Sequence, residues 1–221
     1  MRTSRYWRVV LGHCILLIGC ARDPVDELIS RLSTSDVPGR RAAARTLRDR
    51  SHTDDRVIAA FTKSAKDSDM EVRCLSVEAI GKQGQADKSK ILRLTPSLTD
   101  PEKRVRLEAA LAIAKIDPHD GSPRPVLTGA MREGDGRTLL AIGTMGADAA
   151  WAVPTLVGLL SHESPQVRAL AARTLGRIGP AARAAQPDLE AARRDPNAAV
   201  QSAAKEALKR IATDAMPSGT K

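Results

Sequence analysis

Aromatic residues are almost absent from this chain of 221 residues, and they make up only 2% of it. Because β-sheets rely on aromatic and β-branched side chains, this composition argues against a large β-sandwich or barrel. No apolar run reaches the roughly 18 residues that a membrane-spanning helix needs. Hydrophobic residues still make up 42% and charged residues 28%, so we expect a folded rather than a disordered chain.

The N-terminus has the composition of an export signal. Three arginines lie within the first eight residues, and a short apolar stretch follows at 9–18. That stretch is too short to span a bilayer, but it suits the hydrophobic region of a signal peptide. We therefore expect residues 1–19 to be a processing signal that is removed from the mature protein.

The signal ends in a tetrapeptide that resembles the lipobox of bacterial lipoproteins: Leu17, Ile18, Gly19 and Cys20. This resemblance implies cleavage before Cys20 and attachment of lipid to its thiol. Because Ala21 rather than aspartate follows, the resemblance favours anchoring at the periplasmic face of the outer membrane. The alternative is an ordinary signal peptide whose cleavage site happens to contain cysteine.

Cysteine is scarce in the predicted mature chain. Cys14 leaves with the signal and Cys20 carries lipid, so Cys74 is alone and no intramolecular disulfide can form. Removal of residues 1–19 also lowers the net charge from +9 to +6. Stability must therefore come from packing.

What fills the rest of the sequence is a repeat. Four segments align without gaps and begin at residues 69, 102, 164 and 197, so their spacings are 33, 62 and 33 residues. A shortened copy at 131–146 fills the long interval, and a degenerate copy lies at 36–51. Such a fixed period is typical of stacked repeat architectures.

Each copy has the apolar spacing of an amphipathic helix, as in Val72, Leu75, Ala79 and Ile80. Gly81 and Gly176 follow the periodic stretch, so we expect them to end their helices. Three aspartates, Asp67, Asp100 and Asp195, precede their helices and are candidates to cap free backbone amides.

A second helical segment follows each of the first five copies, at 56–65, 88–98, 125–131, 154–160 and 187–194, and an extra one precedes the first copy at 24–32. The predicted fold is therefore all-α: an α-solenoid of about six helix–turn–helix units that spans residues 20–212. Residues 213–221 are expected to be a disordered tail.

The segment 164–179, with its Val-Arg pair, alanine-rich centre and Leu-Gly-Arg-Ile-Gly end, resembles HEAT repeats of the short type known from phycobilisome lyases. His162 stands where that pattern has aspartate. The resemblance covers nearly all of residues 24–212 and implies the solenoid fold. It says little about activity, because the repeat is a packing unit that hosts unrelated roles.

Residues that could carry chemistry are few, and we predict no catalytic residue, cofactor or metal. The histidines of the mature chain, His52, His119 and His162, lie in predicted turns without a second histidine or cysteine at metal-ligand spacing. The segment 117–121 is the best metal candidate, but its proline and glycine already explain it as a turn. Cys74 is expected to be a buried small hydrophobe rather than a nucleophile.

The arginines have two interpretations. Arg73, Arg106 and Arg168 share one repeat position, and they either form a basic ladder or pair with the inter-repeat aspartates; the resemblance to HEAT-like proteins favours pairing. Arg40, Arg41, Arg45 and Arg48 cluster in the first copy, next to the lipid. They are either candidates for contact with anionic headgroups or simply part of a solvated helix face.

Three functions remain open at this stage. The first is a monomeric, membrane-anchored scaffold that binds another protein, and the repeat architecture favours it. The second is a subunit of a chromophore lyase, which the resemblance implies but the export signal disfavours. The third is nucleic-acid binding, which we do not expect because the net charge is modest and aromatics for base stacking are nearly absent.

Overall fold

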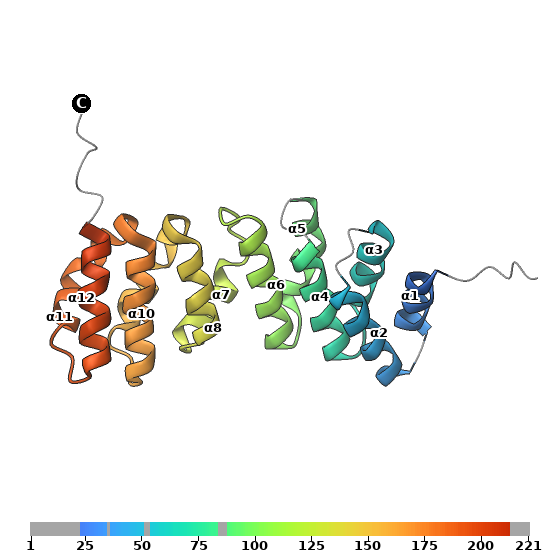
Figure 1. Cartoon of the computed structure of the whole chain (residues 1–221), viewed down its shortest axis with the longest axis horizontal. Helices are drawn as coiled ribbons and strands as arrows, with labels where there is room; N and C mark the ends of the chain where they lie inside the picture. The colour runs from blue at the N-terminus through green and yellow to red at the C-terminus, as the bar shows by residue number, and fades with distance from the viewer. Residues whose placement is uncertain (1–22, 35, 51–53, 84–87, 213–221) are drawn as a thin grey trace, which may run out of the picture.

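The structure is a computed structural model that describes residues 23–34, 36–50, 54–83 and 88–212. The predicted signal peptide, Cys20 and the tail at 213–221 lie outside the described residues. Within those ranges the chain is helical and contains no strand. The helices stack side by side in one row, with α1 at one end and α12 at the other (Figure 1). None of the helices in the described part is long and apolar enough to cross a bilayer.

The helices of the aligned copies form the first layer of the stack. They are α2 (Val37–Asp49), α4 (Met70–Gln83), α6 (Lys103–Ile116), α8 (Gly136–Thr144), α10 (Pro165–Ile178) and α12 (Ala198–Ala212). Contacts between α2 and α4, α4 and α6, α8 and α10, and α10 and α12 join neighbouring units.

The connecting segments form the second layer. It contains α1 (Pro24–Thr34), α3 (Asp55–Ser64), α5 (Ser89–Leu94), η1 (Thr95–Thr99), α7 (Arg124–Arg132), η2 (Gly146–Ala152), α9 (Val153–Leu159), η3 (Gly179–Ala185) and α11 (Gln186–Ala192). Three of these, η1, η2 and η3, are 3₁₀ helices, so the segment predicted at 88–98 is a short α-helix followed by a 3₁₀ turn. The predicted α-solenoid of paired helices is confirmed.

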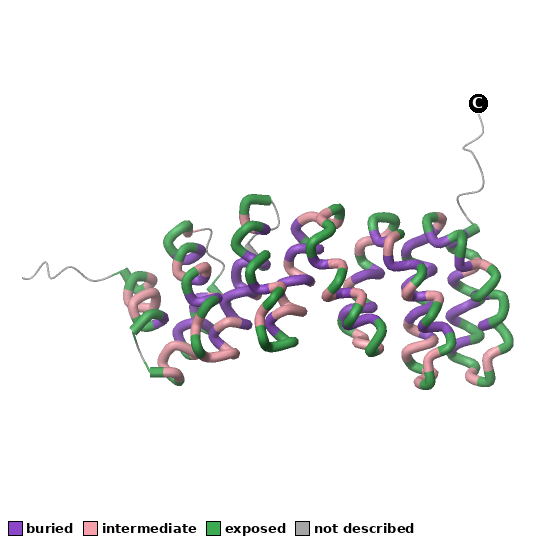
Figure 2. The backbone as a smooth tube through the Cα atoms, turned by 180° about the vertical axis from the view of Figure 1, so that it is seen from behind, coloured by how far each residue is buried: buried purple, intermediate pink, exposed green. Residues whose placement is uncertain are grey.

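Apolar side chains fill the space between the two layers. Figure 2 shows the buried backbone running along the interior of the row, with exposed residues on the outer rims. The stripe predicted in α4 is buried, since Val72, Ala79 and Ile80 are 0% exposed. The buried residues form two clusters that meet at α6. Ala110 and Ala114 of that helix belong to the C-terminal cluster, and its Val105, Ala109 and Ile113 belong to the N-terminal cluster.

The prediction that Gly81 and Gly176 end their helices is wrong. Gly81 lies inside α4, and Gly176 lies inside α10, which ends at Ile178 and is followed by Gly179 with a positive φ of 72°. A Cβ atom added at Gly176 would lie 2.7 Å from the Cα of Ala207 in α12. At Gly81 it would lie 2.6 Å from the Cβ of Ala112 in α6. These glycines therefore allow neighbouring first-layer helices to approach closely.

The fourth unit is shorter than the aligned copy suggests. Residues 131–135 finish α7 and form a turn in which Gly134 has a φ of 74°, so α8 begins only at Gly136. The Asp135 carboxylate caps α8 by accepting a hydrogen bond from the Thr138 amide at 2.7 Å. This leaves α8 with nine residues, whereas α6 and α10 each have fourteen.

Candidate interaction surface

Three arginine–aspartate ion pairs join successive units: Arg40 with Asp67, Arg73 with Asp100, and Arg168 with Asp195. In each pair, Nε and Nη2 of the guanidinium donate to the two carboxylate oxygens over 2.7–3.1 Å. Such a two-point contact fixes the distance and angle between units. The paired side chains are only 8–16% exposed.

The arginines at the repeat position of Arg73, Arg106 and Arg168 also hold the loop before their own helix. Nη1 of Arg73 donates to the carbonyl oxygens of Asp67 at 3.0 Å and Ser68 at 3.1 Å. Arg106 makes the same bonds to Asp100 and Pro101. The aspartate that would pair with Arg106 is replaced by Glu133, which pairs with Lys103 instead. The ladder is therefore interrupted between α6 and the shortened fourth unit.

The ladder aspartates are held in their charged form. Burial by itself would raise the pKa values of Asp67 and Asp100, but hydrogen bonds from Arg40 and Arg73 bring these pKa values below the ordinary range. The Arg168 guanidinium likewise lowers the pKa of Asp195. Each carboxylate also accepts the amide two residues ahead, at Asp69, Glu102 and Asn197, so it caps the turn before the helix rather than the first helical turn.

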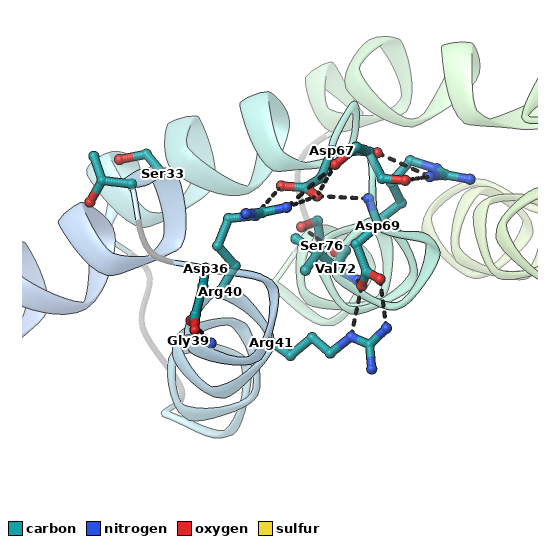
Figure 3. A network of polar contacts seen from close by, with 12 residues as sticks. Ser33, Asp36, Gly39, Arg40, Arg41, Asp67, Asp69, Val72 and Ser76 are labelled. Atoms are coloured by element: carbon teal, nitrogen blue, oxygen red, sulfur yellow. Dashed lines mark hydrogen bonds and ion pairs between the residues drawn. The ribbon is translucent and has the colours of Figure 1, made fainter.

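The arginine cluster of α2 faces α4. Its four members and their partners are Arg40 with Asp67, Arg41 with Asp69, Arg45 with Glu71, and Arg48 with Glu78. Figure 3 shows the contacts of Arg40 with Asp67 and of Arg41 with Asp69. Nη2 of Arg41 lies 2.6 Å from a carboxylate oxygen of Asp69. The structure thus gives all four side chains acidic partners within the chain. Contact with headgroups stays a prediction.

The residues weighed above as metal ligands or nucleophiles lie apart from one another. Nε2 of His119 lies 3.8 Å from Asp148, while Asp117 pairs with Lys88. Among the described residues, no group of three or more histidine, cysteine, aspartate or glutamate side chains could hold a metal ion. Cys74 is 4% exposed, and burial raises the pKa of its thiol, which disfavours the reactive thiolate.

An apolar groove opens on the first layer where the shortened unit lies. It runs between α6 and α8, has a volume of about 290 Å³, and has Leu127 and Ile142 among its lining residues. Leu111 lines it too, and Leu140 of α8 is 47% exposed. These two leucines share one repeat position. The other four copies carry a charged residue there: Arg45, Glu78, Arg173 and Glu206.

The model of the HEAT repeats matches residues 25–114 and 133–209, which together are more than half of the chain. The chain belongs to the HEAT repeat family. The stretch that the family model skips, 115–132, contains the loop and α7, next to the groove. A search of curated proteins finds no match.

Solved structures agree with the HEAT repeat fold. The complex of CpcE and CpcF of phycocyanin lyase from Nostoc sp. PCC7120 matches with a TM-score of 0.57 and 20% identity, over 86% of this chain and 77% of that chain. A designed armadillo repeat protein in complex with the peptide (KR)4 matches with a TM-score of 0.55 and 20% identity, over 86% of this chain and 100% of that chain. At such identities the likeness shows the fold alone.

The apolar pair at Leu111 and Leu140 is the feature that sequence reasoning missed. The signal was present in the aligned copies, because leucine replaces a charged residue in two adjacent units only. A leucine within an amphipathic helix is ordinarily assigned to the core, and only the folded structure shows that Leu140 is exposed.

Proposed function

We propose that this HEAT repeat protein is a non-catalytic scaffold that binds another protein at the cell envelope. The observation that carries the proposal is that large apolar side chains are exposed on a stack whose units are already joined by ion pairs. The ladder of ion pairs joins units to each other, while Leu92 of the second layer and Leu140 of the first are left 78% and 47% exposed. A stack of this kind offers long continuous faces for a partner.

A relative of the same fold supports a protein partner. The designed armadillo repeat protein was solved with a bound peptide, so a stack of such helices can hold a peptide. The likeness to the phycocyanin lyase subunits is equal in strength, but it adds no residue that would act on a chromophore. We therefore favour binding over catalysis.

The proposed anchor is lipid attached to Cys20, with the protein at the periplasmic face of the outer membrane. The support is the lipobox-like sequence 17–20 that follows a basic and then an apolar stretch. The Cys20→Ala variant should accumulate as unprocessed or soluble protein, and cell fractionation followed by immunoblotting measures this. The matched variant Cys74→Ala removes the other cysteine of the predicted mature chain, and it should fractionate with membranes as before.

Chemical crosslinking in native cells, followed by mass spectrometry, tests the scaffold itself. The expected result is a reproducible protein partner that is lost when the gene is deleted. Two outcomes would overturn the proposal. One is a change in absorbance on mixing with a pigment protein, which indicates the lyase alternative. The other is steeply salt-dependent binding to DNA, which indicates a nucleic-acid partner.

A further inference from the structure

We propose that the groove between α6 and α8 binds an acidic segment of the partner protein, which inserts an apolar side chain beside the lining residue Leu111. The exposed Leu140 does not line the groove, but it is three residues after Arg137 and four before Thr144, which both line it, so it lies at the rim on the same side of α8. This inference rests on the proposed scaffold function, and it names the surface and the chemistry of the partner. It follows from the apolar lining of the groove and from the charges that surround it.

The groove is apolar, whereas the other helices of the first layer carry charged residues at the repeat position of Leu111 and Leu140. Ala114, Pro118, Ala141 and Met145 line it together with Leu111. At the same repeat position, the neighbouring copies place Glu78 on one side and Arg173 on the other. The apolar surface is therefore confined to the two middle units, which matches one or two inserted side chains rather than a broad hydrophobic interface.

The charged residues that line the groove are basic, and so are those on its α10 side, whereas Glu78 and Glu108 flank its α6 side. Lys115 and Arg137 line the groove, and Arg177 of α10 lies against α8, because a Cβ added at Gly143 would be 3.0 Å from its Cδ. Arg173 and Arg177 also line the adjacent groove between α10 and α12. These basic side chains extend the positive surface toward the C-terminal end of the stack.

Most of this positive charge is not neutralised within the chain. Arg137 pairs with Glu108 at 2.8 Å, but no ion pair joins Lys115, Arg173 or Arg177 to any carboxylate of the described residues. The α2 end of the same layer differs, because each of its four clustered arginines has an acidic partner on α4 or in the turn just before it. The unpaired positive charge therefore lies at Lys115 and on the α10 side of the apolar groove, and an acidic partner complements it there.

Peptide binding tests the proposed chemistry. The probe is a fluorescein-labelled peptide of glutamates interrupted by two leucines, and its affinity for the full chain is measured by fluorescence anisotropy. We expect it to bind at least about tenfold more tightly than two matched peptides, one with serine for leucine and one with lysine for glutamate. Higher salt should weaken the binding. Equal affinity for the three peptides, or preference for the lysine peptide, would overturn the inference.

Variants locate the site. Leu140→Glu gives α8 a charge at a position where other units carry one, so the helix should fold, and circular dichroism checks this. We expect the variant to weaken binding of the acidic peptide about tenfold or more. The matched variant Leu92→Glu changes the exposed leucine of α5 and should leave binding unchanged. Equal loss in both variants, or loss in Leu92→Glu alone, would place the site elsewhere.

Photocrosslinking separates this inference from the scaffold proposal. A photoreactive residue is introduced at position 140 or at position 92 in cells. Capture from position 140 of a protein whose crosslinked segment is acidic supports the inference. Capture from position 92 alone overturns it and leaves the scaffold proposal standing. If neither position nor chemical crosslinking captures a protein, the scaffold proposal itself fails.

Discussion

Gly176 occupies an interior helical position, where alanine is ordinarily more stable by about 1 kcal/mol. Here the close approach of Ala207 reverses that preference, because an added methyl group would collide with backbone. We expect Gly176→Ala to lower the free energy of unfolding by about 1 kcal/mol, since overpacking typically costs about 1–3 kcal/mol. Urea unfolding measures the change.

Gly129 provides the matched control for this substitution. It lies inside α7, and a Cβ added there would meet nothing within 4 Å. Gly129→Ala should therefore raise the free energy of unfolding by about 0.5–1 kcal/mol. Opposite signs for the two variants are the expected result. A gain in both would show that α10 and α12 are not held at close range.

Asp69 makes stability depend on pH. The Arg41 guanidinium lowers its pKa to about 2, whereas the unfolded chain has an aspartate pKa of about 3.9. Because the folded-state pKa is the lower one, the stabilisation is present above the unfolded value and is lost as the pH falls from about 5 toward 2. We expect the free energy of unfolding to decrease over that range.

Two variants assign this pH dependence. Asp69→Asn and Arg41→Ala each remove one partner of the pair, so both should reduce the loss of stability between about pH 5 and pH 2. Chemical denaturation at a series of pH values measures the slope. An unchanged slope in both variants would mean that other carboxylates dominate the acid response.

At the scale of elements, each unit is stabilised mainly by its neighbours. Residues 164–196 form one period, which contains α10, η3 and α11. Deleting this period should leave a shorter helical stack that unfolds cooperatively at a lower temperature, because α12 then takes the place of α10. Circular dichroism with thermal unfolding measures the outcome.

The control deletion removes only half of this unit. Loss of residues 164–178 takes away α10, and with it the contacts that α10 makes with α8, α9 and α12, but leaves η3 and α11 in place. This shorter deletion should be the more disruptive of the two, with a loss of helical signal per residue. If it were tolerated as well as the full period, the unit of stability would not be the helix pair.

Periodicity alone predicts the order of helices in this chain, since spacings of 33 residues and apolar stripes are local properties of the sequence. The interpretation fails where a residue's role depends on the neighbouring unit. Gly176 has the sequence context of a helix end, and only its distance to Ala207 reveals a contact between helices. The assignment of Leu140 to the core fails for the same reason, because its exposure depends on whether side chains of neighbouring units cover it.

At the scale of the whole molecule, the proposed anchor sets the orientation. Asp23, the first described residue, is three positions after Cys20, and three residues span at most about 11 Å. The α1 end of the row therefore lies next to the membrane if Cys20 carries lipid. Lipid-borne quenchers should then quench a fluorophore at Ser33→Cys and leave Trp151 fluorescent.

Trp151 suits this measurement because it lies in η2, well along the row, with its ring 5.6 Å from the Arg124 guanidinium. It is also the only tryptophan after residue 19. The unlabelled Cys20→Ala variant in solution gives the reference intensity. Equal quenching at positions 33 and 151 would mean that the stack lies flat on the bilayer.

The division of the apolar core at α6 has a mechanical consequence. Because α6 gives Ala110 and Ala114 to one cluster and Val105 and Ala109 to the other, the chain consists of two blocks joined at one helix. No arginine–aspartate pair of the ladder crosses that joint, and the ion pairs that do cross it, Lys103 with Glu133 and Arg137 with Glu108, have basic side chains that are 56% exposed. A force applied between the membrane and a bound partner would act most strongly on the contacts at this joint. Under force, the contacts at α6 should therefore break first, and the protein should extend in two steps.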